Sequence, residues 1–578
     1  MKKQPAKFKR RALPHLLGAT LIATILPASL VLAASTAFAS SATWNVNATS
    51  TDWYTASNWT PAIVPNGLDD TATFGFSNIT SIAFPYDSET EVNGILFSPG
   101  AGAFTISNGE FSFNFKFTVS GVGITNDSGI VQQIVSADDY GTEFFEFING
   151  ASAGSLTAFT NNGGNSSYST KGGITRFRDR ATAGKATFTN LGAYGPFVSG
   201  GQTQFFDASS ANHGVFVSNG NDDWSWAAST QFFNSSTAGD GTFTNNPAIF
   251  GSTIGYPDVP GGSTVFNDTS AAGNGTLTNE GATIDSAFGG QTIFYGTSSA
   301  AHATLVADGG SSGGLGGSIQ FLEDSLGGNA RLKLFGNGNL DISGRNPTGI
   351  TVGSIEGDGL VLLGANSLTV GSNDRSTTFS GMIQNDGSLT KIGAGTFTLI
   401  GANTYTGGTT IEGGELLVDN PPEAGTGTGT GAVQIAAGRL GGKGIIAGAV
   451  TVGTGSGPGA VLAPGKRGGK HGTLTIQSTL TFNSDGTYNC GLRTKHEIAD
   501  KVVARGVTIN GAQFTPLDFG QSALTAGIVF TAIDNTAATP IAGTFSNLAD
   551  GSTFTAGTNT FQVSYEGGDG NDLTLTVQ

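Results

Sequence analysis

A repeat of about 28 residues in the central part of the chain most constrains its fold. A phenylalanine recurs there at spacings of 30, 29, 27, 33, 28 and 27 residues, at Phe147, Phe177, Phe206, Phe233, Phe266, Phe294 and Phe321. Each is followed ten to twelve residues later by a second apolar residue, at Phe159, Phe188, Phe216, Phe243, Leu277, Leu305 and Leu332. Each unit therefore predicts two short strands, in which apolar residues alternate with Thr, Ser or Gln.

A unit of this length favours a solenoid over an array of globular domains. An independent β-sandwich domain needs ~100 residues, which is several times the observed period. In a parallel β-helix, by contrast, each strand pairs with its equivalent in the next coil, and one coil is one repeat. We therefore predict an all-β fold, a parallel right-handed β-helix or β-solenoid, and we expect the seven recurring phenylalanines to point into its core.

Residues 40–130 precede the regular repeat and contain three of the five tryptophans, Trp44, Trp53 and Trp59. The end of a solenoid exposes strand edges and core side chains, so an atypical first unit that covers them is expected. We interpret this segment as an N-terminal cap. An alternative is that the tryptophans are exposed and stack on sugar rings.

The first 39 residues have the pattern of a secretory signal peptide. Six basic residues lie within residues 1–11, an apolar stretch runs from Leu16 to Ala33, and Ala37 and Ala39 are the small residues that a signal peptidase recognises. We expect cleavage between Ala39 and Ser40. An uncleaved anchor is the alternative, because the apolar stretch approaches the ~20 residues that span a bilayer.

Removal of the signal peptide changes the formal charge from −16 to −22, because the six basic residues leave with it. This large negative charge disfavours a nucleic-acid partner, because the phosphate backbone is also negative. No later segment has the length and apolar character of a membrane helix, so we expect the mature chain not to be an integral membrane protein. The predicted location is extracellular, at the cell surface or in the periplasm.

The most specific motif in the chain lies between Leu389 and Val418. Its marks are Leu389, Lys391, Gly393, Gly395, Gly401, Asn403, Tyr405, Gly407, Gly408 and Gly414. This pattern resembles the passenger-associated transport repeat, also called the autotransporter-associated β-strand repeat. The glycines are interpreted as structural residues that permit tight turns. Asn403 is expected to turn inward and to hydrogen-bond along the coil axis.

The resemblance extends over about residues 355–578 and implies a surface protein related to autotransporter passengers. Autotransporters also contain a C-terminal translocator barrel of amphipathic membrane strands, whereas this sequence stops at Gln578 with no room for one. Self-translocation across an outer membrane is therefore not expected, and release into the periplasm and export by separate machinery are the open alternatives. The predicted segments are a signal peptide (1–39), the cap (40–130), solenoid repeats (131–345), the autotransporter-associated repeat region (346–420), further coils (421–485) and a C-terminal segment with a cap (486–578).

Candidate chemical sites are few, and we predict no catalytic, cofactor or metal residue. The acidic pairs Asp69-Asp70, Asp138-Asp139 and Asp222-Asp223 are interpreted as turn residues, because neighbours in a strand point to opposite faces. The histidines His213, His302, His471 and His496 lack metal-ligand spacing. A single calcium-nonapeptide-like stretch comprises Gly567, Gly568, Gly570, Asn571 and Asp572, whereas calcium sites of this type need stacked copies. Cys490, the only cysteine, is expected to be a buried apolar residue.

These features predict a secreted or cell-surface structural or adhesive protein, without enzymatic activity, that presents a repetitive surface. The alternative is an extracellular β-helix that binds or degrades polysaccharide. Cell-envelope or extracellular glycans are the candidate partners. Arg176, Arg178 and Arg180 form the densest basic cluster; on one strand they would share a face, either as solvated residues or as a contact for an anionic glycan.

Overall fold

The computed structural model describes residues 40–578 except 85–87, 109–114, 138–143, 166–170, 196–197, 222–225, 252–259, 347–348 and 467–470. The predicted signal peptide, Ala39, Asp138-Asp139 and Asp222-Asp223 lie outside the described residues. The helices in the described part are three short 3-10 turns, Ala56–Asn58, Pro422–Ala424 and Thr494–His496. Within these same residues, no helix has the length and apolar character required to cross a bilayer.

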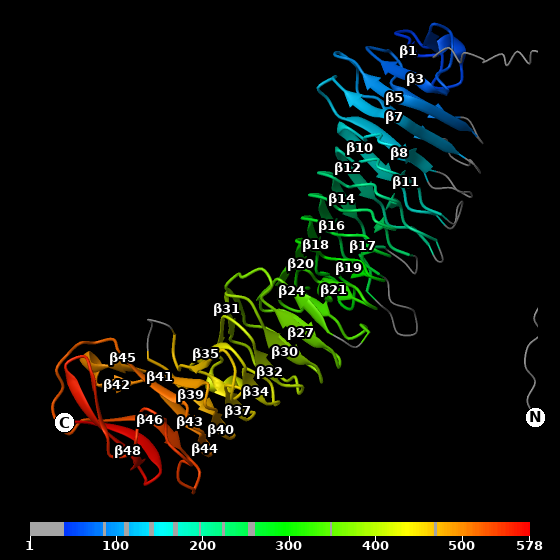
Figure 1. The fold of residues 1–578 in the computed structure, drawn as a ribbon. Helices are drawn as coiled ribbons and strands as arrows, with labels where there is room; N and C mark the ends of the chain where they lie inside the picture. The colour runs from blue at the N-terminus through cyan, green and yellow to red at the C-terminus, as the bar shows by residue number, and fades with distance from the viewer. Residues whose placement is uncertain are drawn as a thin grey trace, which may run out of the picture. The chain divides into compact units, whose positions relative to one another are not determined.

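Strands from successive repeats pair in parallel, so the predicted β-solenoid is confirmed (Figure 1). One sheet contains β9 (Phe144–Phe147), β11 (Ile174–Phe177), β13 (Gln202–Phe205), β15 (Ser229–Phe232), β17 (Ser263–Phe266), β19 (Gln291–Phe294) and β21 (Ser318–Phe321). The second contains β10 (Ser155–Asn161), β12 (Lys185–Asn190), β14 (Val215–Ser218), β16 (Thr242–Asn245), β18 (Thr276–Asn279), β20 (Thr304–Ala307) and β22 (Arg331–Leu334). Each repeat therefore supplies one strand to each sheet, as predicted.

Phenylalanine rings stack along the core at the spacing of the strands. In the first sheet, the ring of Phe232 lies 4.8 Å from that of Phe205 and 4.8 Å from that of Phe266, with interplanar angles of 7°. In the second sheet, Phe188, Phe216 and Phe243 stack at 4.7 Å. The strand spacing of ~4.8 Å is also a contact distance for stacked rings, so one aromatic residue per coil builds a continuous core.

For two of the seven phenylalanines that were predicted to lie in the core, the prediction is wrong, because the preceding residue is the buried one. Phe206 and Phe233 point outward and stack on each other at 4.7 Å, whereas their neighbours Phe205 and Phe232 are fully buried. The other five, Phe147, Phe177, Phe266, Phe294 and Phe321, are buried as predicted. In each Phe-Phe pair, the strand alternation places the first ring inside and turns the second into the solvent-facing bend that follows.

Four buried asparagines and one serine form a second internal column, at the end of the second-sheet strands. Its members are Asn161, Asn190, Ser218, Asn245 and Asn279. The Asn161 side-chain amide donates to Oδ1 of Asn190 at 2.8 Å, and the Thr203 hydroxyl donates to the same oxygen at 2.9 Å. These bonds satisfy buried polar groups and tie a second-sheet strand to the first-sheet strand that follows it.

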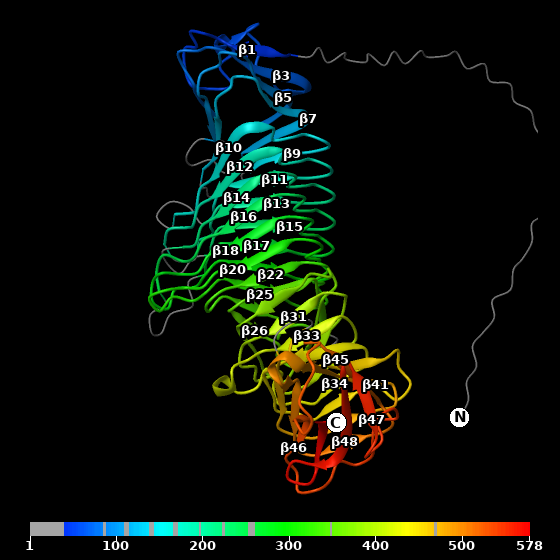
Figure 2. The ribbon, with the colours of Figure 1, turned by 90° about the vertical axis from the view of Figure 1, so that its left-hand side faces the viewer.

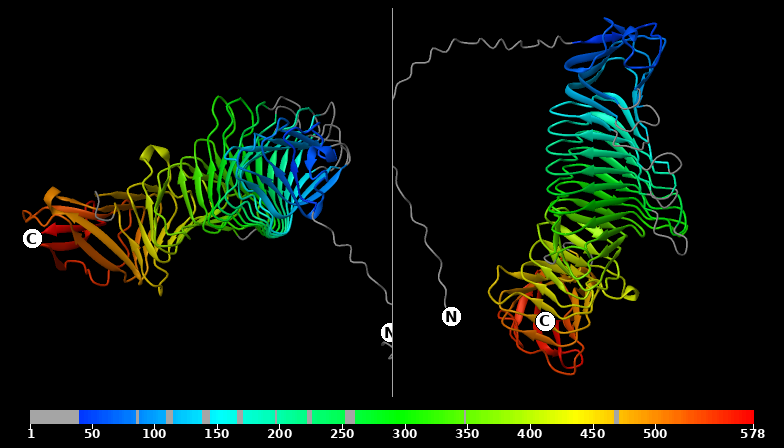
Figure 3. Two further views of the ribbon diagram at one scale, coloured as in Figure 1. Left: turned by 90° about the horizontal axis from the view of Figure 1, so that it is seen from above. Right: turned by 90° about the vertical axis from the view of Figure 1, so that its right-hand side faces the viewer.

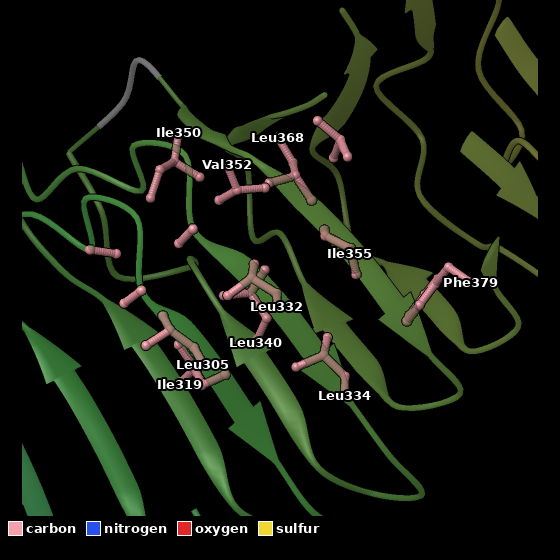
Figure 4. Close-up of a cluster of buried hydrophobic side chains, with 14 of the residues drawn as sticks. Leu305, Ile319, Leu332, Leu334, Leu340, Ile350, Val352, Ile355, Leu368 and Phe379 are labelled. Atoms are coloured by element: carbon pink, nitrogen blue, oxygen red, sulfur yellow. The ribbon is translucent and has the colours of Figure 1, made fainter. Parts of the chain in front are cut away.

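From about residue 350 onward the coils gain a third strand, and the core becomes aliphatic. The added sheet contains β24 (Ile350–Val352), β27 (Ser367–Val370), β30 (Ser388–Lys391), β32 (Thr409–Ile411), β34 (Val433–Ile435), β37 (Val450–Val452), β40 (Leu480–Phe482) and β44 (Val507–Ile509). Figure 4 shows this transition, where Leu332, Ile355 and Leu368 pack between coils. Branched aliphatic residues fill the corners that three-stranded coils create.

The tryptophan-containing segment caps the N-terminal end of the core. β1 (Ala42–Trp44) pairs in parallel with β3 (Gly67–Phe74) and antiparallel with β2 (Trp59–Thr60). Trp44, Trp53 and Trp59 are at most 1% exposed, and the ring of Trp59 lies edge-on to those of Trp44 and Trp53 at 5.0 and 4.9 Å. The buried tryptophans thus lie over the first strands of the core, where a cap is expected. The alternative of an exposed sugar-binding tryptophan surface is wrong, because the three rings are buried.

The C-terminal strands, orange to red in Figure 3, change from parallel to antiparallel pairing. β46 (Val529–Asn535) pairs in parallel with β43 (Lys501–Ala504) but antiparallel with β49 (Asp572–Val577), and β49 continues into β48 (Asn559–Gly567) and β47 (Thr553–Ala556). The calcium-like stretch lies in the turn between β48 and β49. There Oδ1 of Asp572 accepts a 2.9 Å hydrogen bond from the backbone N–H of Asn535.

Candidate functional site

The repeat between Leu389 and Val418 forms one coil and part of the next. β30 is followed by β31 (Thr396–Leu399), β32 and β33 (Glu415–Val418), and each pairs with strands of the neighbouring coils. Asn403 turns inward between coils. Its Oδ1 accepts from the backbone N–H of Ile383 at 2.8 Å, and its Nδ2 donates to the Gly427 carbonyl at 2.7 Å. This amide therefore joins the preceding and following coils.

Two glycines of the motif show why small residues are needed there. Gly393 has a φ of +70°, in the left-handed region that residues with a Cβ adopt at a cost. Gly401 has an ordinary φ but lies directly against the carbonyl of Gly381 in the preceding coil, where an added Cβ would overlap backbone atoms. Their function is thus to allow coils to stack closely.

Lys391 is a charged residue turned into the solenoid at the end of β30. The whole residue is 1% exposed, and its Nζ donates to the carbonyls of Gly393 at 3.2 Å and Gly413 at 3.3 Å, as well as to that of Ile392. Burial lowers the pKa of Lys391 to about 8, and the Asp374 carboxylate partly offsets this shift. The lysine thus caps carbonyl groups of two coils.

We expect Lys391 to make the stability of the chain depend on alkaline pH. The folded protein releases this proton near pH 8, whereas the unfolded chain holds it to about pH 10.5, so the free energy of unfolding rises between these values. Lys391→Met should flatten that rise in urea unfolding experiments run at successive pH values. Lys443→Met, at an exposed lysine, is the control and should keep the wild-type slope; an unchanged slope in Lys391→Met would contradict the assignment.

The arginine cluster differs from its predicted geometry. Only Arg176 lies in a strand, β11, while Arg178 and Arg180 follow in the turn, so the three do not share one strand face. The Arg176 guanidinium lies 4.3 Å from the ring centre of Phe144 and donates to Oε1 of Gln204 at 3.1 Å. Arg178 lies 4.0 Å from Glu146 and 3.7 Å from Asp207. Arg176 and Arg178 are thus already in contact with neighbouring side chains. None of the three arginines lines the 880 Å³ pocket of the C-terminal coils or the 470 Å³ pocket beside Tyr194.

The remaining predicted positions are scattered. Asp70 is buried and accepts from the backbone N–H groups of Ser40 and Asn66, while Asp69 is exposed on the other face of β3. His213 lies 3.8 Å from Asp240 in the next coil. The Cys490 thiol is buried and donates to the Asp500 carbonyl at 3.4 Å. Among the described residues, no three His, Cys, Asp or Glu side chains form a group suited to a metal ion.

A pocket of about 880 Å³ lies in the C-terminal coils. It is lined by Ile400, Asp419, Lys443, Gly465, Lys466, His471, Gly472 and Thr473. Lys466 pairs with Asp419 at 3.1 Å, and the backbone N–H of Lys443 donates to the same carboxylate at 3.2 Å. The acidic residue is therefore already bound by neighbouring groups of the chain.

The sequence analysis missed a surface along one side of the coils (Figure 2). It is formed by the connections that lead from each second-sheet strand to the next first-sheet strand. We call this surface the loop face; it comprises residues 191–201, 219–228, 246–262, 280–290 and 308–317, apart from those outside the description. It exposes Tyr194 at 64%, Trp226 at 69%, Ile249 at 56% and Phe250 at 59%. The sequence signal that could have indicated this surface is the occurrence of these large apolar residues outside the alternating pattern of the strands.

Comparison with known proteins identifies the repeat. The Passenger-associated-transport-repeat family matches residues 389–418. The adhesin BmaC autotransporter of Brucella suis biovar 1 (strain 1330) is 39% identical over 89 residues, which are 15% of this chain and 2% of that protein. The crystal structure of the Haemophilus influenzae Hap adhesin aligns with 90% of this chain and 65% of that chain, at 11% identity and a TM-score of 0.25.

The strand pairing defines the class of protein, a parallel β-solenoid, and the family match shows that one part of it, residues 389–418, is a passenger-associated transport repeat. More particularly, an 89-residue stretch of the chain is similar to part of an autotransporter adhesin. The chain spans only a small part of its curated relative and slightly less than two thirds of the solved chain.

Proposed function

We propose that this protein is an exported, non-enzymatic adhesin whose solenoid presents a repetitive surface outside the cell. The principal observation is the parallel stacking, which places equivalent side chains of successive coils in columns on the outer faces. Such columns offer many equal contacts to an extended partner and suit multivalent attachment. The local similarity to a Brucella adhesin supports the same role.

The absence of enzymatic activity is part of this proposal. Hydrolysis or lysis of a polysaccharide requires acidic and basic groups that converge on one bond. In the described part of the chain, Asp69 and Asp70 point to opposite sides of a strand. Arg176 and Arg178 are each bound by neighbouring side chains. The exported form is proposed to begin at Ser40 and to act at the cell surface.

Adhesion can be tested with beads coated with the purified chain from Ser40 onward. We expect saturable attachment to cell or matrix surfaces, inhibited by the same protein in solution. Beads coated with an unrelated acidic protein of equal charge control for electrostatic attachment. Attachment no greater than that of the control would overturn the proposal, as would turnover of acidic or neutral polysaccharides by the purified chain.

A further inference from the structure

A pocket of about 470 Å³ lies on the loop face between three successive coils. It is lined by Leu191, Gly192, Ala193, Tyr194, Asn219, Gly220, Asn246, Pro247 and Ile249. Its volume falls within the ~300–1,000 Å³ that small-molecule sites occupy. Tyr194 and Ile249 supply exposed apolar surface, and Asn219 and Asn246 supply amide groups. The described lining thus combines an aromatic ring with neutral hydrogen-bonding groups.

The two asparagines begin a polar column that follows the solenoid axis. Asn219, Asn246, Glu280 and Asp308 each donate a backbone N–H to the coil before, at 2.9 to 3.0 Å, from the position directly after the inner asparagine column. They therefore occupy equivalent outward positions on four coils, ~4.8 Å apart. Nδ2 of Asn246 donates to Oδ1 of Asn219 at 2.7 Å, which leaves the other amide positions of this pair available to a ligand.

The charge along this column selects among ligands. No described residue that lines the pocket is charged at neutral pH, and the next two residues of the column are carboxylic acids. Burial raises the pKa of Glu280 and of Asp308, and the Asp308 carboxylate raises the pKa of Glu280 further. A polyanion that followed the column would meet the carboxyl groups of Glu280 and Asp308, and none of the described residues of the pocket or of the column is a cation, so a neutral ligand is favoured.

A sugar ring matches the remaining chemistry of the pocket. One face of a pyranose consists of C–H groups, which pack on an exposed aromatic ring, and its edge consists of hydroxyls, which pair with amides and carboxyls. The length of one sugar residue is also close to the spacing of the column. An extended glycan could therefore contact one outward side chain with each residue along the axis.

We propose that the pocket beside Tyr194, together with the column from Asn219 to Asp308, binds an uncharged glycan. This inference deepens the adhesive function proposed above and rests on it. Tyr194 packs on a sugar ring, Asn219 and Asn246 bind its hydroxyls, and Glu280 and Asp308 disfavour acidic glycans. The proposed contact is one of binding, and no bond of the glycan is broken.

Affinity electrophoresis of the chain from Ser40 onward tests this site, with mannan, mixed-linkage glucan, galactan and chitin oligosaccharides as neutral probes and polygalacturonate as the acidic probe. At least one neutral probe should retard the wild type, and polygalacturonate should not. Tyr194→Ala should weaken the retardation at least tenfold. Phe76→Ala removes an aromatic residue of similar exposure, 63%, from the N-terminal segment and should bind as the wild type does.

A double variant, Glu280→Gln with Asp308→Asn, tests the selectivity. It should keep neutral binding and gain retardation by polygalacturonate, because the repelling charges are gone. The site is refuted if no neutral probe retards the wild type, if Tyr194→Ala and Phe76→Ala behave alike, or if polygalacturonate binds best. If coated beads still adhere in any of these cases, for instance to a surface stripped of glycans, the proposed adhesive function is retained. The result would then show that this pocket is not the cause of adhesion.

Discussion

Replacing Phe232 by alanine should lower the free energy of opening the surrounding coils by about 3–5 kcal/mol. Its ring is fully buried, stacks on Phe205 and Phe266, and lies edge-on to Phe243 at 5.8 Å. Truncation leaves a cavity between coils that the stacked backbones cannot close, because their hydrogen bonds set the spacing. Native-state amide exchange in β13, β15 and β17 measures the effect where it arises.

The adjacent Phe233 provides a control of the same residue type. It stacks on Phe206 outside the sheet and is only partly buried, so Phe233→Ala should cost less than about 1 kcal/mol. Both variants leave the backbone pattern unchanged. Equal losses from the two substitutions would contradict the inward orientation assigned to Phe232.

The substitution Gly401→Ala should separate neighbouring coils within the passenger-associated repeat. The new Cβ would overlap the Gly381 carbonyl oxygen and lie 2.8 Å from the Ser380 carbonyl oxygen. Both obstacles are backbone atoms, so no side-chain rotation relieves them. We expect a loss of at least about 2–3 kcal/mol, seen as a lower thermal midpoint and as faster amide exchange in β28 (Thr377–Phe379) and β31.

Gly413 is the matched control for this test. An alanine Cβ there would have its nearest neighbour at 3.4 Å, an ordinary contact, and the φ of Gly413 is not positive. Gly413→Ala should therefore leave stability unchanged or raise it by about 0.4–1 kcal/mol, through the reduced entropy of the unfolded chain. If Gly401→Ala were equally harmless, close stacking of coils would not explain the glycine in the motif.

The repeat length alone predicted the class of fold, because a short period with two apolar positions has few other solutions. It did not decide which phenylalanine of a Phe-Phe pair is internal, since both fit a period that varies between coils. The deciding signal was the threonine two residues earlier. Thr203 and Thr230 are buried on the same side of their strands as Phe205 and Phe232, while Gln204 and Gln231 alternate outward.

The loop-face pocket was harder to foresee for a different physical reason. Asn219 and Asn246 become neighbours only because the chain completes one coil between them, and the connections that follow them differ in length. Tyr194 likewise lies in a segment without strand alternation. The sequence shows which residues each loop contains, but it does not show that the loops of three coils surround one pocket.

The stacked core also makes the number of coils free to vary. The coil containing Phe205 and Phe216 meets its neighbours through the same two aromatic stacks on either side. After one coil is duplicated or deleted, the coils that become neighbours would thus still meet through equivalent surfaces, provided that the break falls at matching positions. Unequal recombination between such segments could lengthen or shorten the protein in whole-coil steps, with the segments before and after the repeats left unchanged.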